Sequence, residues 1–211
     1  MELPFRHEQS AYPDGKGRAV KQLRISLIAP SGAGKSTVAH LLKSAFELSG
    51  CTVQVLKLAR PLYQLQADFY RKCGIELAED QQDQHLLELI AKEMRRIAPQ
   101  SLVHHFGRQL AKVNADVVLN DDLRDDQTDW PWLRCNGFTV IRIKASTSLC
   151  RRRLQDRGDL TSVHDSPLNA QIAKIREDYT IVNEGALDSL DTQVKALAAL
   201  LLQSEAVATW G

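Results

Sequence analysis

The sequence predicts an α/β fold in which a parallel five-stranded sheet lies between two layers of helices, a three-layer sandwich. Two observations predict it. Short apolar runs typical of buried strands alternate along the chain with longer segments of helical periodicity. Strands that are joined by helices form parallel sheets covered on both faces. The length of 211 residues suits a single domain over 1–211 with a core of its own.

The first expected elements are a strand, a helix and a second strand. The segment 23–28 is aliphatic and short, as a buried strand requires. The following segment, 34–48, carries its apolar residues on one helical face. The second strand is expected over 52–58, which is rich in β-branched residues.

The middle of the chain is expected to be mainly helical. From 61 to 98 the apolar spacing is helical, with interruptions at Gly74 and in a polar stretch over 79–84. A further helix is expected from Pro99 to Val113, with Ser101 as its N-cap. A short apolar run over 116–119 predicts the third strand.

The last part of the chain repeats the alternation. A loop with Trp130 and Trp132 leads through a short helix to a strand over 139–143. The two tryptophans could stack on a bound base or pack beneath the loop. A basic helix then begins at Ser146 and is stopped by Gly158. The remaining expected elements are a helix over 168–177, a strand over 179–182 and a closing helix over 187–203.

Composition excludes several functional classes. The 27 basic and 26 acidic residues nearly cancel, so no global field attracts nucleic acid or an anionic membrane. No apolar run approaches the roughly 20 residues of a membrane span, and residues 1–20 form an arm without a secretory signal. The four cysteines form no CxxC pair. We therefore expect a soluble, cytoplasmic protein with reduced thiols, and the sequence leaves a homodimer open.

The segment 29–36, Ala-Pro-Ser-Gly-Ala-Gly-Lys-Ser, has the pattern of a phosphate-binding loop. Its glycines let backbone N–H groups reach a phosphate, and the helix that follows adds its positive dipole end. Lys35 is expected to bridge the β- and γ-phosphates of ATP, and the Ser36 hydroxyl to bind Mg²⁺. The expected ATP-binding residues are Ser31, Gly32, Ala33, Gly34, Lys35, Ser36 and Thr37. The alternative is a glycine-rich turn that occurs by chance.

The type of phosphate-loop protein is narrowed by what accompanies the loop. The guanine-reading Asn-Lys-x-Asp segment of signalling GTPases is absent. Small kinases shield the transferred phosphoryl group with an arginine-rich lid. Arg153 and Arg157 are four residues apart in a basic tract, so they share a helical face. We expect a lid over 150–168, with a solvated basic helix as the alternative.

Further segments give a resemblance to a known family. Leu58 to Tyr63, Asp122-Leu123-Arg124 and the segment 178–185, Asp-Tyr-Thr-Ile-Val-Asn-Glu-Gly, resemble motifs of the nucleoside monophosphate kinase group. The chain is most similar to phage-type deoxynucleoside monophosphate kinases and their dephospho-coenzyme A kinase relatives. The resemblance implies a P-loop kinase fold with a helical acceptor-binding region, which would cover 59–113 here.

The resemblance also implies roles for individual residues. Asp122 or its neighbour Asp121 would hold Mg²⁺ or orient the acceptor. The arginines implied to bind the acceptor are Arg60, Arg95, Arg96 and Arg124. Those implied to act in catalysis, together with Lys35 and Asp122, are Arg124, Arg153 and Arg157.

The chain departs from the family pattern on the acceptor side. Arg60 stands where the family has an aspartate, and the segment 125–127, Asp-Asp-Gln, replaces Phe-Pro-Asn. The expected activity is ATP- and Mg²⁺-dependent phosphorylation of a nucleoside monophosphate or a similar small phosphorylated molecule. A kinase for a hydroxyl acceptor and a non-catalytic nucleotide-binding regulator are the alternatives.

Overall fold

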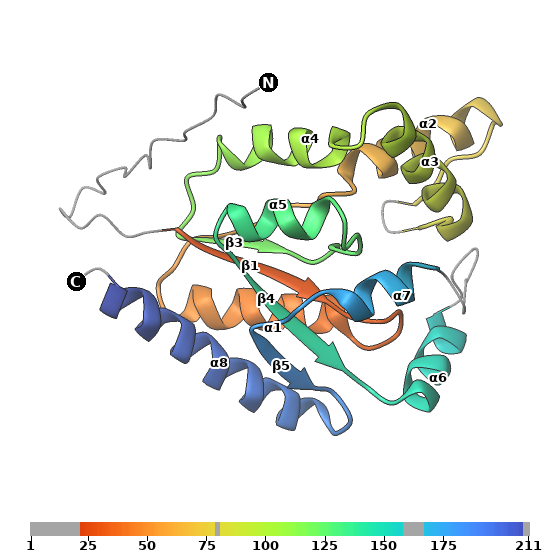
Figure 1. Cartoon of the computed structure of the whole chain (residues 1–211). Helices are drawn as coiled ribbons and strands as arrows, with labels where there is room; N and C mark the ends of the chain where they lie inside the picture. Colours follow the sequence, from red (N-terminus) through yellow and green to blue (C-terminus); the bar gives the residue numbers. More distant parts are fainter. Residues whose placement is uncertain (1–21, 79–80, 158–166, 209–211) are drawn as a thin grey trace.

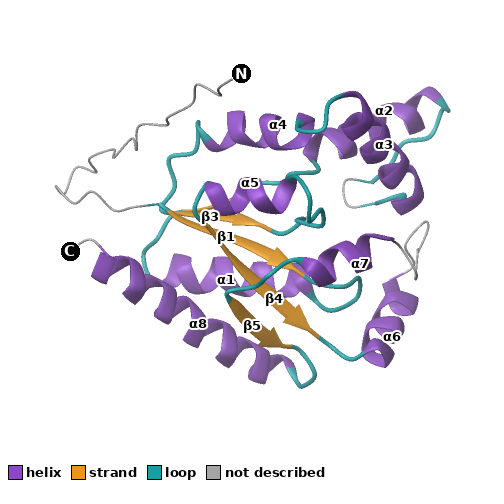
Figure 2. Cartoon of the chain, in the orientation of Figure 1, coloured by secondary structure: helices purple, strands orange, loops and turns teal. Residues whose placement is uncertain are grey.

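The computed structural model describes residues 22–78, 81–157 and 167–208. It contains a five-stranded sheet with the strand order β2-β3-β1-β4-β5. The strands are β1 (Leu23–Ile28), β2 (Val53–Val55), β3 (Val117–Asn120), β4 (Phe138–Lys144) and β5 (Tyr179–Val182). All four pairings are parallel. The predicted fold class, a parallel sheet with helices on both faces, is confirmed (Figures 1 and 2).

The described helices agree with the expected ones in number and order, and differ at their ends. They are α1 (Lys35–Leu48), α2 (Arg60–Lys72), α3 (Gln84–Ile97), α4 (Ser101–Leu110), α5 (Asp129–Cys135), α6 (Thr147–Arg157), α7 (Pro167–Lys174) and α8 (Leu187–Ala208). Ser101 is the first helical residue of α4, whose N-cap is Gln100. Strand β2 is shorter than expected because this edge strand pairs with β3 only from Val53 to Val55.

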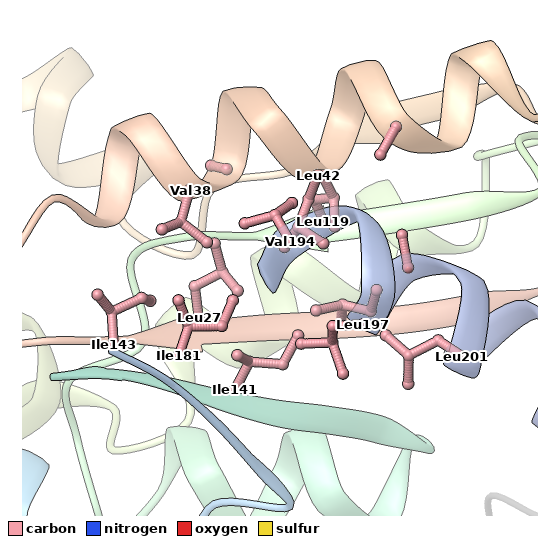
Figure 3. Packing of buried hydrophobic residues seen from close by; sticks show 14 of the residues in the cluster. Leu27, Val38, Leu42, Leu119, Ile141, Ile143, Ile181, Val194, Leu197 and Leu201 are labelled. Atoms are coloured by element: carbon pink, nitrogen blue, oxygen red, sulfur yellow. The ribbon is translucent and has the colours of Figure 1, made fainter. Parts of the chain in front are cut away.

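One face of the sheet packs against α1 and α8. Because successive strand residues point to opposite faces, Ile25 and Leu27 of β1 both face this layer. They are fully buried and meet Val38 and Leu42 of α1. Figure 3 shows Leu27, Val38 and Leu42 packing beside Val194 and Leu197 of α8. Fully burying an aliphatic side chain of this size contributes about 1.5–3 kcal/mol, so this layer holds the loop between β1 and α1 on a rigid base.

The other face carries α4, α5 and α7, as Figure 1 shows. Ile28 and Val140 point to this side, where they contact a cluster that includes Phe106 of α4 and Leu133 of α5. A separate small cluster joins α2, α3 and α4 through Leu62, Leu87 and Leu102. The helical region that follows β2 therefore has a core of its own beside the sheet.

The parallel strands end at one edge of the sheet, where ligands bind in open α/β folds. Five connections meet there: the loop after β1, the segments after β2 and β3, the start of α6 after β4, and the turn after β5 (Figure 2). None of the described helices is long and apolar enough to cross a membrane.

Candidate functional site

The loop between β1 and α1 has the backbone geometry of an anion-binding loop. Gly32 and Gly34 have φ angles of 80° and 92°, which L-residues with a side chain rarely adopt. A Cβ atom on Gly32 would lie 2.4 Å from the Cys150 carbonyl oxygen, and one on Gly34 would lie 2.2 Å from Asn183 Nδ2. Helix α1 begins at Lys35 without a side-chain cap. Its first N–H groups are therefore available to a phosphate.

Lys35 lies between this loop and the end of β3. Its ammonium group donates a hydrogen bond to the backbone oxygen of Asp121. Burial, assisted by the positive charge of Arg124, lowers the pKa of Lys35 to about 8, although Asp121 and Asp122 act in the opposite direction. Phosphate groups bound beside the ammonium would favour its charged form. A bound anion would therefore raise the pKa of Lys35 again.

Ser36 and Thr37, which open α1 with Lys35, are exposed, as is Ser31 in the loop. The Ser36 hydroxyl is a hard oxygen donor, which suits Mg²⁺. Among the described residues, no group of three or more His, Cys, Asp or Glu side chains could hold a metal ion by itself. An ion bound beside nucleotide phosphates would have Ser36 as a protein ligand. A Mg²⁺ bound there would neutralise charge on the phosphates.

Asp121 and Asp122 have different surroundings. The Asp121 carboxylate is buried and forms an ion pair with Lys57. The Asp122 carboxylate accepts hydrogen bonds from the backbone N–H groups of Leu58 and Ala59, both at 2.9 Å, and from the Asn120 amide at 2.6 Å. Through these hydrogen bonds Asp122 holds the segment before α2 at the end of β3. Asp121 is the acid that lies with two lysines at the sheet edge.

Replacing Asp122 with alanine should destabilise the protein strongly. Hydrogen bonds to a charged group are worth about 1.5–3 kcal/mol each and are not additive, so we expect a loss of about 2–4 kcal/mol in the free energy of unfolding. Urea titration measures it. The exposed Asp68, which pairs with Arg71 across one helical turn, provides the control, because Asp68→Ala should change the value by less than about 1 kcal/mol. A similar small change for Asp122→Ala would contradict the assigned role.

Lys57 is a site residue that the sequence analysis missed. It follows β2, and its ammonium forms an ion pair with Asp121, which directly follows the neighbouring strand β3. Its position after the carboxyl end of a strand could have indicated a site residue, because ligands bind at these ends in open α/β folds. The partner could not be known before the strand order was, because the two residues are 64 positions apart.

Among the predicted acceptor arginines, Arg124 is set apart by its surroundings. It is half-buried and makes no hydrogen bond or ion pair with a described residue. Its positive charge helps to lower the pKa of Lys35. Burial and Asp122 raise the pKa of Tyr63, and the charge of Arg124 opposes that rise. The charge of Arg124 therefore acts on both Lys35 and Tyr63.

Each of the other three predicted acceptor arginines has a side-chain partner. Arg95 forms an ion pair with Asp129 at 2.6 Å and approaches Asp125 at 3.9 Å. Arg96, one residue further along the same helix, is exposed and pairs with Glu93 at 2.6 Å. Arg60 is also exposed, and its guanidinium donates to the Gln109 side chain at 3.3 Å. The charges of Arg95 and Arg96 are thus engaged by neighbouring carboxylates.

Two buried carboxylates lie near Arg95: Asp125, in the segment that departs from the family pattern, and Asp129 at the start of α5. Burial raises the pKa of Asp129 to about 6, despite the opposing charge and hydrogen bond of Arg95. In the unfolded chain this aspartate has an ordinary pKa of about 3.9. Between about pH 4 and pH 6, Asp129 is therefore protonated in the native state and ionised in the unfolded state.

This difference predicts how stability depends on pH. Because the native state binds the extra proton, the contribution of Asp129 to stability falls as pH rises from about 4 to 6, and is constant above. A pKa difference of about two units corresponds to roughly 2–3 kcal/mol. Urea titrations at pH 4.5 and 7 on the wild type and on Asp129→Asn measure it. Only the wild type should show this decline, and identical pH dependence of the two proteins would contradict the prediction.

Arg153 faces the phosphate loop from α6. Its Nη2 atom donates to Asn183 Oδ1 at 3.3 Å, and its Nη1 atom is buried without a partner among the described residues. That atom lies 3.7 Å from the position of a Cβ on Gly34. Arg151 and Arg152 are exposed. The side chain of Arg157 and the rest of the predicted lid over 158–166 lie outside the described part of the chain.

The tryptophans of α5 serve packing. Trp132 meets Phe106 edge to face, with ring centroids 5.9 Å apart and an interplanar angle of 84°. Such contacts stabilise a core by about 0.5–1.5 kcal/mol beyond area burial. Both tryptophans were expected in a loop and lie instead in α5; of the two readings left open by the sequence, packing holds for Trp132.

Comparison with known proteins gives structural neighbours only. No protein-family model and no curated protein matches the sequence. Shikimate kinase from Aquifex aeolicus superposes with a TM-score of 0.50 and 16% sequence identity over 87% of this chain and 98% of that chain. Shikimate kinase from Bacteroides thetaiotaomicron gives a TM-score of 0.50 and 14% identity over 85% and 98% of the two chains. At these identities the likeness establishes the fold, which is the P-loop kinase fold.

Proposed function

We propose that this chain is an ATP-dependent kinase that transfers a phosphoryl group to a hydroxyl of a small polar molecule. The observation that carries the proposal is the contact of Lys35 with Asp121, which joins an uncapped anion-binding loop to an acidic strand end. Phosphoryl transfer needs positioning and charge neutralisation rather than covalent chemistry. Lys35, Ser36 and the loop N–H groups would hold the donor phosphates, and the Asp121 carboxylate would orient the acceptor hydroxyl.

The surroundings of the arginines favour a hydroxyl over a phosphate acceptor. Two arginines that converge on one anion would favour a phosphate acceptor. The Arg95 charge is engaged by Asp129 and that of Arg96 by Glu93, and Arg60 is exposed and bonded to Gln109. Of these four arginines, Arg124 is the half-buried one without a side-chain partner among the described residues. Two enzymes that share this fold are kinases named for shikimate, which makes hydroxyl-bearing small acids the first acceptors to test.

A nucleoside monophosphate, the acceptor implied by the sequence resemblance, is the second candidate. Arg124 favours it, because a half-buried guanidinium with no ion pair to a described residue attracts an anionic group. The same arginine could bind the carboxylate of a hydroxy acid. The acceptor test must therefore include both chemical classes.

ADP release from MgATP across an acceptor panel tests the proposal. The panel contains shikimate and other hydroxy acids, polyols, nucleosides, dephospho-coenzyme A and nucleoside monophosphates. We expect one hydroxyl-bearing class to raise ADP release well above the rate without acceptor. Stimulation by nucleoside monophosphates alone would assign the second candidate instead. If no acceptor raises the rate, the kinase proposal fails and a nucleotide-binding regulator is favoured.

A further inference from the structure

The turn after β5 places an asparagine between the phosphate loop and α6. Asn183 is buried, with 5% of its surface exposed. Its backbone N–H donates to the Lys144 carbonyl at 2.8 Å, which continues the pairing with β4. Its side chain is thereby held at the carboxyl edge of the sheet. The segment 178–185, singled out in the sequence, has no other group in the site described above.

Both polar atoms of the Asn183 amide form hydrogen bonds. Its Nδ2 atom donates to the Ala33 carbonyl at 2.9 Å, inside the phosphate loop. Its Oδ1 atom accepts from Arg153 Nη2 at 3.3 Å. One short side chain therefore contacts both the loop and the arginine. The second arginine nitrogen, Nη1, is left buried and without a partner among the described residues, close to Gly34.

A buried guanidinium nitrogen without a partner is costly, and an anion at the loop would satisfy it. Arginine has several rotatable bonds and loses roughly 2 kcal/mol of rotamer entropy when it is fixed. Asparagine, which has fewer, loses less when its neighbours hold it. Anchoring the guanidinium through Asn183 before the ligand arrives lowers that part of the binding cost.

We propose that Asn183 is a positioning residue for nucleotide phosphates, acting by aiming Arg153 at the phosphate loop; this inference rests on the proposed function for ATP as the ligand. Asn183 does not itself touch the phosphates. It fixes the loop carbonyl of Ala33 on one side and the guanidinium of Arg153 on the other. The loop and the arginine consequently keep one spacing.

The alternative is that Asn183 only completes the end of β5. Thermodynamic coupling separates the two. If Asn183 acts through Arg153, removing it costs nothing more once the arginine is gone, so the two substitutions are not additive. If Asn183 only supports the fold, Asn183→Ala either leaves ligand affinity unchanged or weakens it by the same factor with and without Arg153. A change in thermal stability alone would not produce the coupling.

The test is isothermal titration calorimetry with MgAMPPNP, a non-hydrolysable ATP analogue, so that no acceptor is needed. The proteins are the wild type, Asn183→Ala, Arg153→Ala and the double variant. Gln193→Ala is the matched control, because Gln193 bonds the Val182 carbonyl at 3.0 Å from the exposed side of the same strand end. Lys35→Met is included to test the ligand itself. The thermal midpoint of every variant is measured in parallel.

We expect Asn183→Ala and Arg153→Ala each to weaken binding about tenfold, and the double variant to lose no more than about twofold beyond Arg153→Ala. Gln193→Ala should bind like the wild type. Unchanged affinity for Asn183→Ala, or a double variant weakened about a hundredfold, would overturn the inference. Should Asn183→Ala not fold, Asn183→Leu serves in the same cycle, since it keeps a side chain of similar size and removes both the oxygen for Arg153 and the donor to Ala33.

Failure of the proposed function has a different signature. In that case the wild type does not bind MgAMPPNP, or Lys35→Met binds it as the wild type does. Tight wild-type binding that depends on Lys35 but not on Asn183 would overturn this inference alone and leave the kinase proposal standing.

Discussion

Lys35→Met should abolish phosphoryl transfer while leaving the protein at least as stable as the wild type. In the proposed function the ammonium meets the transferred phosphates, and losing such a charge costs on the order of a hundredfold or more in turnover. In the free protein, however, burial holds its pKa at about 8 instead of 10.5. A lowered lysine pKa means that the native state disfavours the charged form, so removing the charge relieves a strain on folding.

The size of that relief follows from the pKa. A shift of about 2.5 units corresponds to roughly 3 kcal/mol, which we reduce to about 1–2 kcal/mol because the side chain is partly exposed and its hydrogen bond to Asp121 is also lost. The thermal midpoint of Lys35→Met at pH 7 should therefore equal or exceed that of the wild type.

Two measurements check this result: ADP release with the acceptor found in the panel, and thermal unfolding. Lys43→Met is the control, because Lys43 lies on the same helix, is exposed and pairs with Glu47 at 3.8 Å. It should alter neither value appreciably. Retained turnover in Lys35→Met would remove Lys35 from the site, and a clearly lower midpoint would show that its charge stabilises the free protein.

The phosphate loop was predictable because its function depends on local backbone geometry. Glycine spacing, a preceding strand and a following helix are all visible in one stretch of sequence, and the structure places positive φ angles at Gly32 and Gly34. Short apolar runs likewise predicted the strands, since a strand covered by helices on both faces buries nearly all of its residues, as β1 does.

The acceptor side was less predictable because its chemistry depends on pairs that are distant in sequence. Arg95 and Arg96 are adjacent in sequence and point to different neighbours, and only the packing of α3 shows that Arg95 meets the buried Asp129. Asp121 and Asp122 were equivalent in the sequence. The backbone of the β2–α2 connection, bonded to Asp122, separates their roles.

Gly34→Ala should both destabilise the protein and remove nucleotide binding. An alanine at a φ of 92° is strained, by about 1–2 kcal/mol. Its Cβ would also lie 2.2 Å from Asn183 Nδ2, so the amide that holds Ala33 would have to move. We expect a loss of about 2–4 kcal/mol in the free energy of unfolding and a reduction in MgAMPPNP affinity of about a hundredfold or more.

Gly50→Ala is the control that introduces backbone strain without a steric clash. Gly50 has a φ of 84°, similar to that of Gly34, but open space where its Cβ would lie. This substitution should cost only about 1–2 kcal/mol and leave nucleotide affinity unchanged. Adding Asn183→Ala to Gly34→Ala removes the atom that collides, so part of the lost stability should return, whereas affinity should not, because Arg153 is then without its anchor. Equal destabilisation by the two glycine substitutions, or no recovery in the double variant, would show that the Gly34–Asn183 contact does not limit the loop.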